Sequence, residues 1–346
     1  MKKRVVVICP GRGTYTKETL GYLRNYGGGV QDFIADIDER RRKLNVPTIT
    51  ELDSADIFKP NLHTKGEHAS ALIYASSYAD FMAIDRARFE IVAVTGNSMG
   101  WYLAAAFGGS LDWAGGFEVV NTMGSMMKED VIGGQVIYPV VDEKWVKSPK
   151  RIELVRDAIA KVSRQAGCEC YVSIDLGGYA VIGATKAAIP LLLKALPVEE
   201  NYPFQLINHA AFHTPLLKST SNRALELLKP ELFARPEIPL IDGRGCIWSP
   251  YTTDVENLYR YTLVDQVVEK YNFTADVSVA LKEFAPDHLV LLGPGSTLGG
   301  AIGQILIEND WRGLKSKQDF TDLQAKDPFL FAMGRPEQRA LVTELR

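Results

Sequence analysis

A serine between two glycines, placed where a strand ends and a helix begins, is the feature that most constrains this chain. Residues 91–95 form an apolar, β-branched run typical of a buried strand, and residues 101–107 are Ala-rich with helical spacing. Gly96, Ser98 and Gly100 lie between them. In this context Gly-x-Ser-x-Gly indicates a nucleophile elbow, a tight turn that exposes the serine hydroxyl beside free N–H groups at a helix N-terminus. The alternative is a glycine-rich turn with an incidental serine.

A serine hydroxyl is a weak nucleophile at neutral pH, so this hypothesis requires a base. The chain has five histidines. His213 stands just before an apolar helix predicted over residues 216–228, and its ring is therefore expected to project from a loop over the core. For the remaining histidines we expect structural roles: His63, His68, His209 and His288.

The order of predicted strands and helices indicates an α/β protein with an insertion. From about residue 136 to residue 209, short strand-like runs alternate with two helical segments. We therefore expect residues 1–135 and 210–346 to form an α/β core, with residues 136–209 as a small, separately packed subdomain. The main-body elements predicted are strands at 5–9, 91–95 and 289–292 and helices at 14–24, 68–88, 101–107 and 216–228.

Composition excludes several classes of protein. The 346 residues are 46% hydrophobic and 23% charged with a formal charge of −3, and no long run of one sign marks a nucleic-acid partner. No apolar stretch reaches the roughly 18 to 20 residues of a membrane span, and the N-terminus leads directly into a strand, so we expect a cytoplasmic protein with no membrane partner. Four scattered cysteines suit neither a disulfide framework nor a metal site, and we expect them to be reduced and structural: Cys9, Cys168, Cys170 and Cys246.

Four motifs together resemble the malonyl-CoA:acyl-carrier-protein acyltransferase family, which includes the acyltransferase domains of polyketide and fatty acid synthases. Residues 10–13 match the family's PGQG turn, residues 96–100 its GHSxG elbow, residues 211–215 the segment with its catalytic histidine and residues 292–295 a late motif. The resemblance covers nearly the whole chain. It implies an α/β-hydrolase-like large subdomain with an inserted ferredoxin-like small subdomain.

The resemblance also implies ping-pong acyl transfer without a cofactor. Ser98 would attack an acyl-CoA thioester, His213 would take its proton, and the phosphopantetheine thiol of an acyl carrier protein would receive the acyl group. Backbone N–H groups of Met99 and Arg12 would form the oxyanion hole, with Arg12 standing where the family has glutamine. Gln266 aligns with the position whose main-chain carbonyl orients the histidine; the alternative is an ordinary polar residue on a helix face.

Departures from the family pattern concern the acyl group. Malonyl-selective members hold the substrate carboxylate with an arginine where this chain has Met123. Asn97 replaces the family's histidine before the nucleophile, and Trp101 replaces its glutamate after the elbow. Phe212 precedes His213 as in domains that exclude an α-methyl branch. These four residues predict a neutral, unbranched acyl group, acetyl or longer, unless Arg12 or another cation replaces the missing arginine.

Alternative functions remain open at this point. One is a malonyltransferase with a non-standard anchor, another is a thioester hydrolase acting on acyl carrier protein, and a third is an inactive scaffold. Gly293 and Gly295 are expected to end a strand, and the alternative is that they line the site. Since carrier proteins are acidic, basic residues near the site would support docking, and the candidates are Arg4, Lys147, Lys150, Arg151 and Lys218.

Overall fold

A parallel sheet with one antiparallel edge strand forms the centre of the larger part of the protein. The computed structural model describes residues 1–126 and 131–343. Within them, β1 (Lys3–Cys9) lies between β2 (Phe89–Gly96) and β10 (His288–Leu291), and both neighbours run parallel to it. The sheet order is β11-β10-β1-β2-β7-β8, in which β8 runs antiparallel to β7. The outer strands are β7 (Leu240–Ile241), β8 (Ile247–Trp248) and β11 (Leu330–Ala332).

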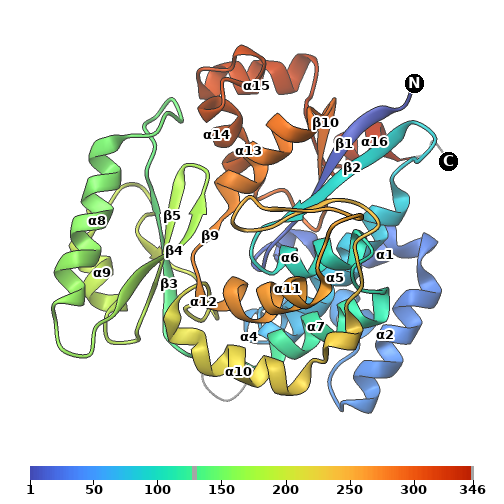
Figure 1. The fold of residues 1–346 in the computed structure, drawn as a ribbon, viewed down its shortest axis with the longest axis horizontal. Helices are drawn as coiled ribbons and strands as arrows, with labels where there is room; N and C mark the ends of the chain where they lie inside the picture. Colours follow the sequence, from blue (N-terminus) through green and yellow to red (C-terminus); the bar gives the residue numbers. More distant parts are fainter. Residues whose placement is uncertain (127–130, 344–346) are drawn as a thin grey trace.

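The sequence of β1 explains its central position. Val5, Val6, Val7, Ile8 and Cys9 expose no surface. Successive side chains of a strand point to opposite faces, so a strand covered on both faces needs an unbroken apolar run. Helices α5 (Gly66–Ala83), α6 (Gly100–Phe107) and α7 (Trp113–Ser125) lie on one side of the sheet. Helices α13 (Phe273–Phe284) and α14 (Gly299–Glu308) lie on the other (Figure 1).

Two helices on the first side meet backbone to backbone. These are α5 (Gly66–Ala83) and α7 (Trp113–Ser125). A β-carbon on Gly66 would lie 2.5 Å from the carbonyl oxygen of Gly124, and one on Gly124 would lie 2.7 Å from that of Gly66. The glycines therefore allow a helix approach that larger residues would prevent.

A second sheet forms the smaller part of the protein and has its own apolar core. Its order is β6-β3-β5-β4-β9, with α8 (Pro149–Ser163) and α9 (Ile189–Ala195) packed against it. The predicted alternation of strands and helices is observed, and the α/β fold class with two subdomains is confirmed. The strands are β3 (Gly134–Pro139), β4 (Cys170–Leu176), β5 (Tyr179–Ala184), β6 (Phe204–Gln205) and β9 (Tyr271–Asn272).

The exact limits of the small subdomain, 136–209, remain a prediction. Strand β3 begins two residues earlier, at Gly134, and β9 joins the small sheet from the C-terminal half of the chain by pairing in parallel with β4. This strand brings the segment that follows α12 (Gln266–Val268) against the small sheet.

The helix predicted over residues 14–24 is wrong. The segment contains a 3₁₀ turn at Lys17–Thr19 and then α1 (Tyr22–Tyr26). Gly21 separates them with a φ of 85°, a left-handed conformation that a continuous helix does not contain. Helix α5 also ends five residues before the predicted position 88, because the chain turns at Asp85, whose carboxylate accepts the backbone N–H of Ala87 at 2.9 Å.

The described residues include no helix long and apolar enough to cross a membrane. The remaining helices are α2 (Gln31–Lys43), α3 (Ile49–Asp53), α4 (Pro60–His63), α6 (Gly100–Phe107), α10 (Lys218–Leu227), α11 (Val255–Arg260), α13 (Phe273–Phe284), α14 (Gly299–Glu308), α15 (Lys317–Lys326) and α16 (Pro336–Val342), with a π-helical segment at Tyr261–Asp265.

Gly100→Ala tests the contact between α6 and β1. The new β-carbon would lie 2.3 Å from the carbonyl oxygen of Cys9, and the backbone of a central strand cannot give way cheaply. We expect the free energy of unfolding to fall by about 1–3 kcal/mol. Gly300→Ala in α14 is the control, because a β-carbon there meets nothing within 4 Å, and we expect it to raise stability by about 0.5–1 kcal/mol. Equal effects in urea denaturation would contradict this account.

Candidate active site

The turn between β2 and α6 holds Ser98 in a strained conformation. Its φ is 56°, in the left-handed region that a serine rarely adopts. The turn closes tightly: a β-carbon on Gly96 would lie 2.3 Å from the carbonyl oxygen of Gly100. The two glycines are therefore required by space, and the turn presents Ser98 at the carboxyl edge of the parallel sheet, where ligands of open α/β sheets bind.

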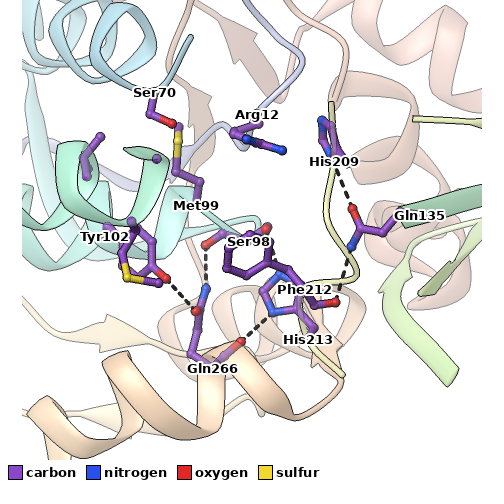
Figure 2. Close-up of a pocket in the computed structure, with 13 residues that line it drawn as sticks. Arg12, Ser70, Ser98, Met99, Tyr102, Gln135, His209, Phe212, His213 and Gln266 are labelled. Carbon is purple, nitrogen blue, oxygen red and sulfur yellow. Dashed lines mark hydrogen bonds between the residues drawn. The ribbon is translucent and has the colours of Figure 1, made fainter. Parts of the chain in front are cut away.

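A chain of hydrogen bonds links Ser98 to His213 and Gln266 (Figure 2). Ser98 Oγ lies 2.7 Å from His213 Nε2, and His213 Nδ1 lies 2.6 Å from the main-chain carbonyl oxygen of Gln266. Since a carbonyl can only accept, Nδ1 carries the proton and Nε2 is left to accept from the serine hydroxyl. The structure thus brings together three residues that the sequence singled out separately.

His213 is held as a neutral imidazole. Burial lowers its pKa to about 4, although the bond to the Gln266 carbonyl acts in the opposite direction. Its backbone is also fixed, with a φ of 60° and an N–H that donates to the Val267 carbonyl at 2.8 Å. A neutral, oriented histidine beside a serine is the arrangement required of a general base.

The side chain of Gln266 ties α12 to the elbow. Its Nε2 donates to the Ser98 carbonyl at 3.0 Å, and its Oε1 accepts from the Tyr102 hydroxyl at 3.0 Å. Sequence reasoning missed Tyr102, which lies in the first turn of α6, two residues after the last glycine of the elbow.

Residues of the small sheet support the loop that carries His213. Ser173 Oγ donates to the Phe212 carbonyl at 2.9 Å, and Gln135 Nε2 donates to Ser173 Oγ at 2.7 Å. His209 Nδ1 lies 3.1 Å from Gln135 Oε1. No sequence motif indicated Gln135 or Ser173, because their role depends on which strands pair.

Two backbone N–H groups remain free for an oxyanion. In the part of the chain that the structure describes, no hydrogen bond engages the N–H of Met99 or that of Arg12. Met99 directly follows Ser98, and Arg12 lies in the turn after β1, next to β2. These are the two donors predicted from the sequence, and their role stays a prediction.

A cavity of about 40 Å³ lies beside Ser98 and shares lining residues with a larger cleft of about 400 Å³ between the two sheets. Met123 and Phe212 line the small cavity, as expected of residues that contact an acyl group, whereas Asn97 lines the cleft. The small volume suits a short acyl chain. Apolar residues of the small sheet and the loop after it line the cleft, including Ile137, Ile174, Leu176, Val181 and Leu206.

Trp101 does not line either space, so the prediction that it contacts substrate is wrong. Its side chain is fully buried, and the indole N–H donates to Thr262 Oγ1 at 3.0 Å. Its ring packs edge-on against Tyr261, with centroids 5.2 Å apart. Trp101 therefore faces the π-helical segment at Tyr261–Asp265, and its large side chain packs in the core.

The predicted docking cations differ in their surroundings. Lys147 pairs with Glu308 at 2.7 Å and Arg151 pairs with Glu199 at 2.8 Å. Arg4 lies near the start of β1, at the opposite end of that strand from the elbow. Lys150 and Lys218 are exposed at the starts of α8 and α10. Two of the five are therefore paired within the protein, and docking of a carrier protein through these residues stays a prediction.

Several remaining positions are structural. A β-carbon on Gly293 would lie 2.1 Å from the Tyr22 hydroxyl oxygen, and Gly295 has a φ of 73°.

Within the described ranges no group of three or more His, Cys, Asp or Glu residues could hold a metal ion. The cysteines are unpaired, with Cys246 exposed and the others buried.

Comparison with known proteins identifies the fold. No protein-family model and no curated protein matches the sequence. Among similar solved structures are an acyl-carrier-protein S-malonyltransferase of Burkholderia pseudomallei 1710b (19% identity, 99% of each chain, TM-score 0.73) and a malonyl-CoA:acyl carrier protein transacylase of Xanthomonas oryzae pv. oryzae (18% identity, 99% of this chain and 100% of the other, TM-score 0.72). A third is the malonyl-transacylase of a type II polyketide synthase in complex with its acyl carrier protein (18% identity, 98% of each chain, TM-score 0.71).

The chain has the malonyl-CoA:acyl carrier protein transacylase fold. The resemblance drawn from the four motifs is confirmed at this level, including the large α/β part and the small ferredoxin-like part. Because sequence identity is below 20%, the similarity establishes architecture, and the chemistry must be argued from the site itself.

The lowered pKa of His213 predicts an unusual pH profile for acylation of Ser98. At pH 5.5 an ordinary histidine with a pKa of about 6.5 would be about 90% protonated and inactive as a base. His213, with a pKa of about 4, stays neutral there. We expect the acylation rate to hold down to about pH 5 and to fall through about pH 4; a fall centred near pH 6.5 would contradict the assignment.

This rate must be measured by a short pH jump from neutral solution. A histidine whose pKa is lower in the folded state than in the unfolded state binds its proton preferentially when unfolded. Stability is therefore lost as the pH falls from about 6.5 through about 4, and prolonged incubation would measure unfolding instead.

Tyr102→Phe tests the hydrogen bond that the Tyr102 hydroxyl donates to Gln266 Oε1. Removing the hydroxyl leaves Gln266 Oε1 buried without a donor, which costs about 1–3 kcal/mol of stability, and we expect Ser98 acylation to slow on the order of 10-fold because the elbow loses its fixed position. Tyr259→Phe is the matched control. It removes a buried hydroxyl that donates to the Leu228 carbonyl at 3.0 Å, away from the site, and should lower stability without slowing acylation.

Proposed function

We propose that this protein is an acyltransferase that moves a short acyl group from acyl-CoA to the phosphopantetheine thiol of an acyl carrier protein through an acyl-serine intermediate. The observation that carries the proposal is the 2.7 Å contact between Ser98 Oγ and His213 Nε2 in a strained strand-to-helix turn. The fold shared with malonyl-transacylases, one of them solved in complex with its carrier protein, supports the choice of acceptor.

In the first half-reaction, His213 Nε2 takes the proton of the Ser98 hydroxyl as Oγ attacks the thioester carbonyl. The carbon–oxygen bond forms, and the carbonyl electrons move to an oxyanion that the N–H groups of Met99 and Arg12 stabilise. The tetrahedral intermediate then collapses with cleavage of the carbon–sulfur bond. CoA leaves as its thiol, having received the proton from His213.

The second half-reaction reverses these roles with a new thiol. His213 takes the proton of the phosphopantetheine thiol, and the sulfur attacks the ester carbonyl of acyl-Ser98. Collapse of the second tetrahedral intermediate returns the proton from His213 to Ser98 Oγ and leaves the acyl group on the carrier protein. The Gln266 carbonyl keeps the imidazole in one tautomer throughout both steps.

The small cavity beside Ser98 supports a short acyl group. Met123 in its wall predicts a neutral one, as the sequence did, whereas Arg12 at its rim provides the cation that a malonyl group requires. A hydrolase would use the same acyl-serine and release it to water. Transfer is favoured by the fold shared with malonyl-transacylases, one of them solved in complex with its acyl carrier protein.

Intact-protein mass spectrometry tests the proposal directly. The protein is incubated separately with acetyl-, butyryl-, hexanoyl- and malonyl-CoA in the absence of an acceptor. We expect a persistent increase equal to one acyl group with at least one of the short acyl-CoAs, since Ser98 forms the ester and no thiol is present to remove it.

Ser98→Ala is the control and should give no adduct with any acyl-CoA. An adduct that survives in Ser98→Ala would assign the nucleophile to another residue. Release of free acid by the wild-type protein, without a lasting adduct, would support the hydrolase instead. If no acyl-CoA is consumed, the proposed function is wrong.

A further inference from the structure

Arg12, at the edge of the small cavity, is a cation without a charged partner among the residues that the structure describes. Its side chain lines both the cavity and the cleft. One nitrogen of its guanidinium, Nη2, donates to the Asn208 carbonyl at 2.6 Å. Within the described ranges the guanidinium makes no other hydrogen bond, and no carboxylate oxygen lies within 4 Å of its nitrogens. The group thus retains donors that face the cavity and the cleft.

The surroundings of Arg12 make this arrangement costly. Burial lowers the pKa of Arg12 to about 10, a value at which it remains charged near neutral pH. The two histidines that line the same cavity are neutral and add no charge of their own. Burial lowers the pKa of His213 to about 4, and burial together with the charge of Arg12 lowers the pKa of His209 well below its usual value. Of the described residues that line the cavity, Arg12 alone is charged at neutral pH.

The guanidinium lies close to the part of the cavity wall formed by α5 and α7. A β-carbon on Gly66 would lie 2.8 Å from Arg12 Nη1, and Gly66 is in backbone contact with Gly124, the residue after Met123. Ser70 Oγ, which also lines the cavity, lies 2.9 Å from a β-carbon built on Gly124. Figure 2 shows Arg12 above Ser98, between Ser70 and His209 in this view. Arg12 therefore reaches the wall formed by α5 and α7, the helix that carries Met123.

We propose that the Arg12 guanidinium binds a terminal carboxylate of the acyl group, so that this enzyme selects short acyl chains that carry a negative charge. The inference rests on the proposed acyl transfer and goes against the neutral acyl group predicted from Met123. An anion would satisfy the unused donors of Arg12 and compensate its charge, and a guanidinium offers the planar fork that a carboxylate fits.

One residue would then serve two purposes. The main-chain N–H of Arg12 is a predicted oxyanion donor, while its side chain would fix the far end of the acyl group. Binding at both ends holds the thioester carbonyl in one position relative to Ser98, which favours attack. A short chain is required because the cavity of about 40 Å³ leaves room for few atoms beyond the carbonyl.

The test compares two acyl-CoAs of nearly the same shape. Malonyl-CoA ends in a carboxylate, and acetoacetyl-CoA replaces that group with a neutral methyl ketone. The rate at which each loads Ser98 is followed by rapid quench and intact-protein mass spectrometry. We expect the wild-type protein to load malonyl on the order of 10- to 100-fold faster, the gain typical of a charge-assisted hydrogen-bonded pair.

Variants assign that preference to a residue. Arg12→Gln keeps the backbone N–H and should reduce the malonyl-to-acetoacetyl ratio to near one, and Arg12→Lys should give an intermediate ratio because it keeps charge but not the fork. Arg223→Gln is the matched control. This arginine is exposed on α10 and pairs with Glu226, so its loss should leave the ratio unchanged.

A rescue variant covers the possibility that Arg12→Gln lowers overall activity. Adding Met123→Arg to Arg12→Gln returns a guanidinium to the same cavity from α7 and should restore part of the malonyl preference. Loading of acetoacetyl but not malonyl by the wild-type protein would overturn the inference and leave the proposed function intact. An unchanged ratio in Arg12→Gln would do the same. Failure of both thioesters to load Ser98 would overturn the inference, and the proposed function would be overturned with it only if acetyl-, butyryl- and hexanoyl-CoA also failed to load Ser98.

Discussion

Between β2 and α6 the backbone turns so tightly that neither glycine of the elbow has space for a β-carbon. This constraint fixes Ser98 in a left-handed conformation, clear of the strand and next to the first N–H groups after it. The strain is tolerated because buried neighbours hold the turn from several directions. The Tyr271 hydroxyl donates to the Gly96 carbonyl, and Gln266 donates to the Ser98 carbonyl.

The site depends on pairing between segments that are distant in the sequence. His213 follows the small subdomain, Gln266 lies 53 residues later, and Ser173 and Gln135 reach the histidine loop from β4 and β3. Through these bonds the small sheet positions the base while the large sheet positions the nucleophile. The cleft lies between them, so a substrate that enters there contacts both subdomains.

Short sequence patterns predicted those parts of the site that depend on residues close together in the chain. The glycines around Ser98 and the loop before a helix at His213 indicated both residues, and the alternation of strands and helices indicated two subdomains. The helix over 14–24 failed because apolar spacing was followed past Gly21, whose positive φ interrupts it. Trp101 was misplaced because a motif gives position along the chain but not the direction in which a side chain of α6 points.

Other features could not be predicted from the sequence, because they depend on contacts between distant segments. The support from Gln135 and Ser173 follows from β3 and β4 lying in one sheet with β5 between them, which no local pattern specifies. The isolation of Arg12 is likewise a property of its surroundings, since it results from which carboxylates are absent near it among the described residues. The sequence shows that arginine replaces the family's glutamine at position 12. It does not show that the Arg12 side chain lies beside the contact between α5 and α7.

Pre-steady-state release of CoA tests the central claim, that Ser98 and His213 form an acyl-serine reserved for a thiol acceptor. The protein is mixed with an excess of malonyl-CoA or acetoacetyl-CoA, samples are quenched at millisecond to second intervals, and the released CoA is separated by chromatography and quantified. The account predicts a burst of one CoA per protein molecule, then almost no release until pantetheine is added, when CoA release resumes. A steady release of CoA without a burst, unchanged by the acceptor, would contradict it.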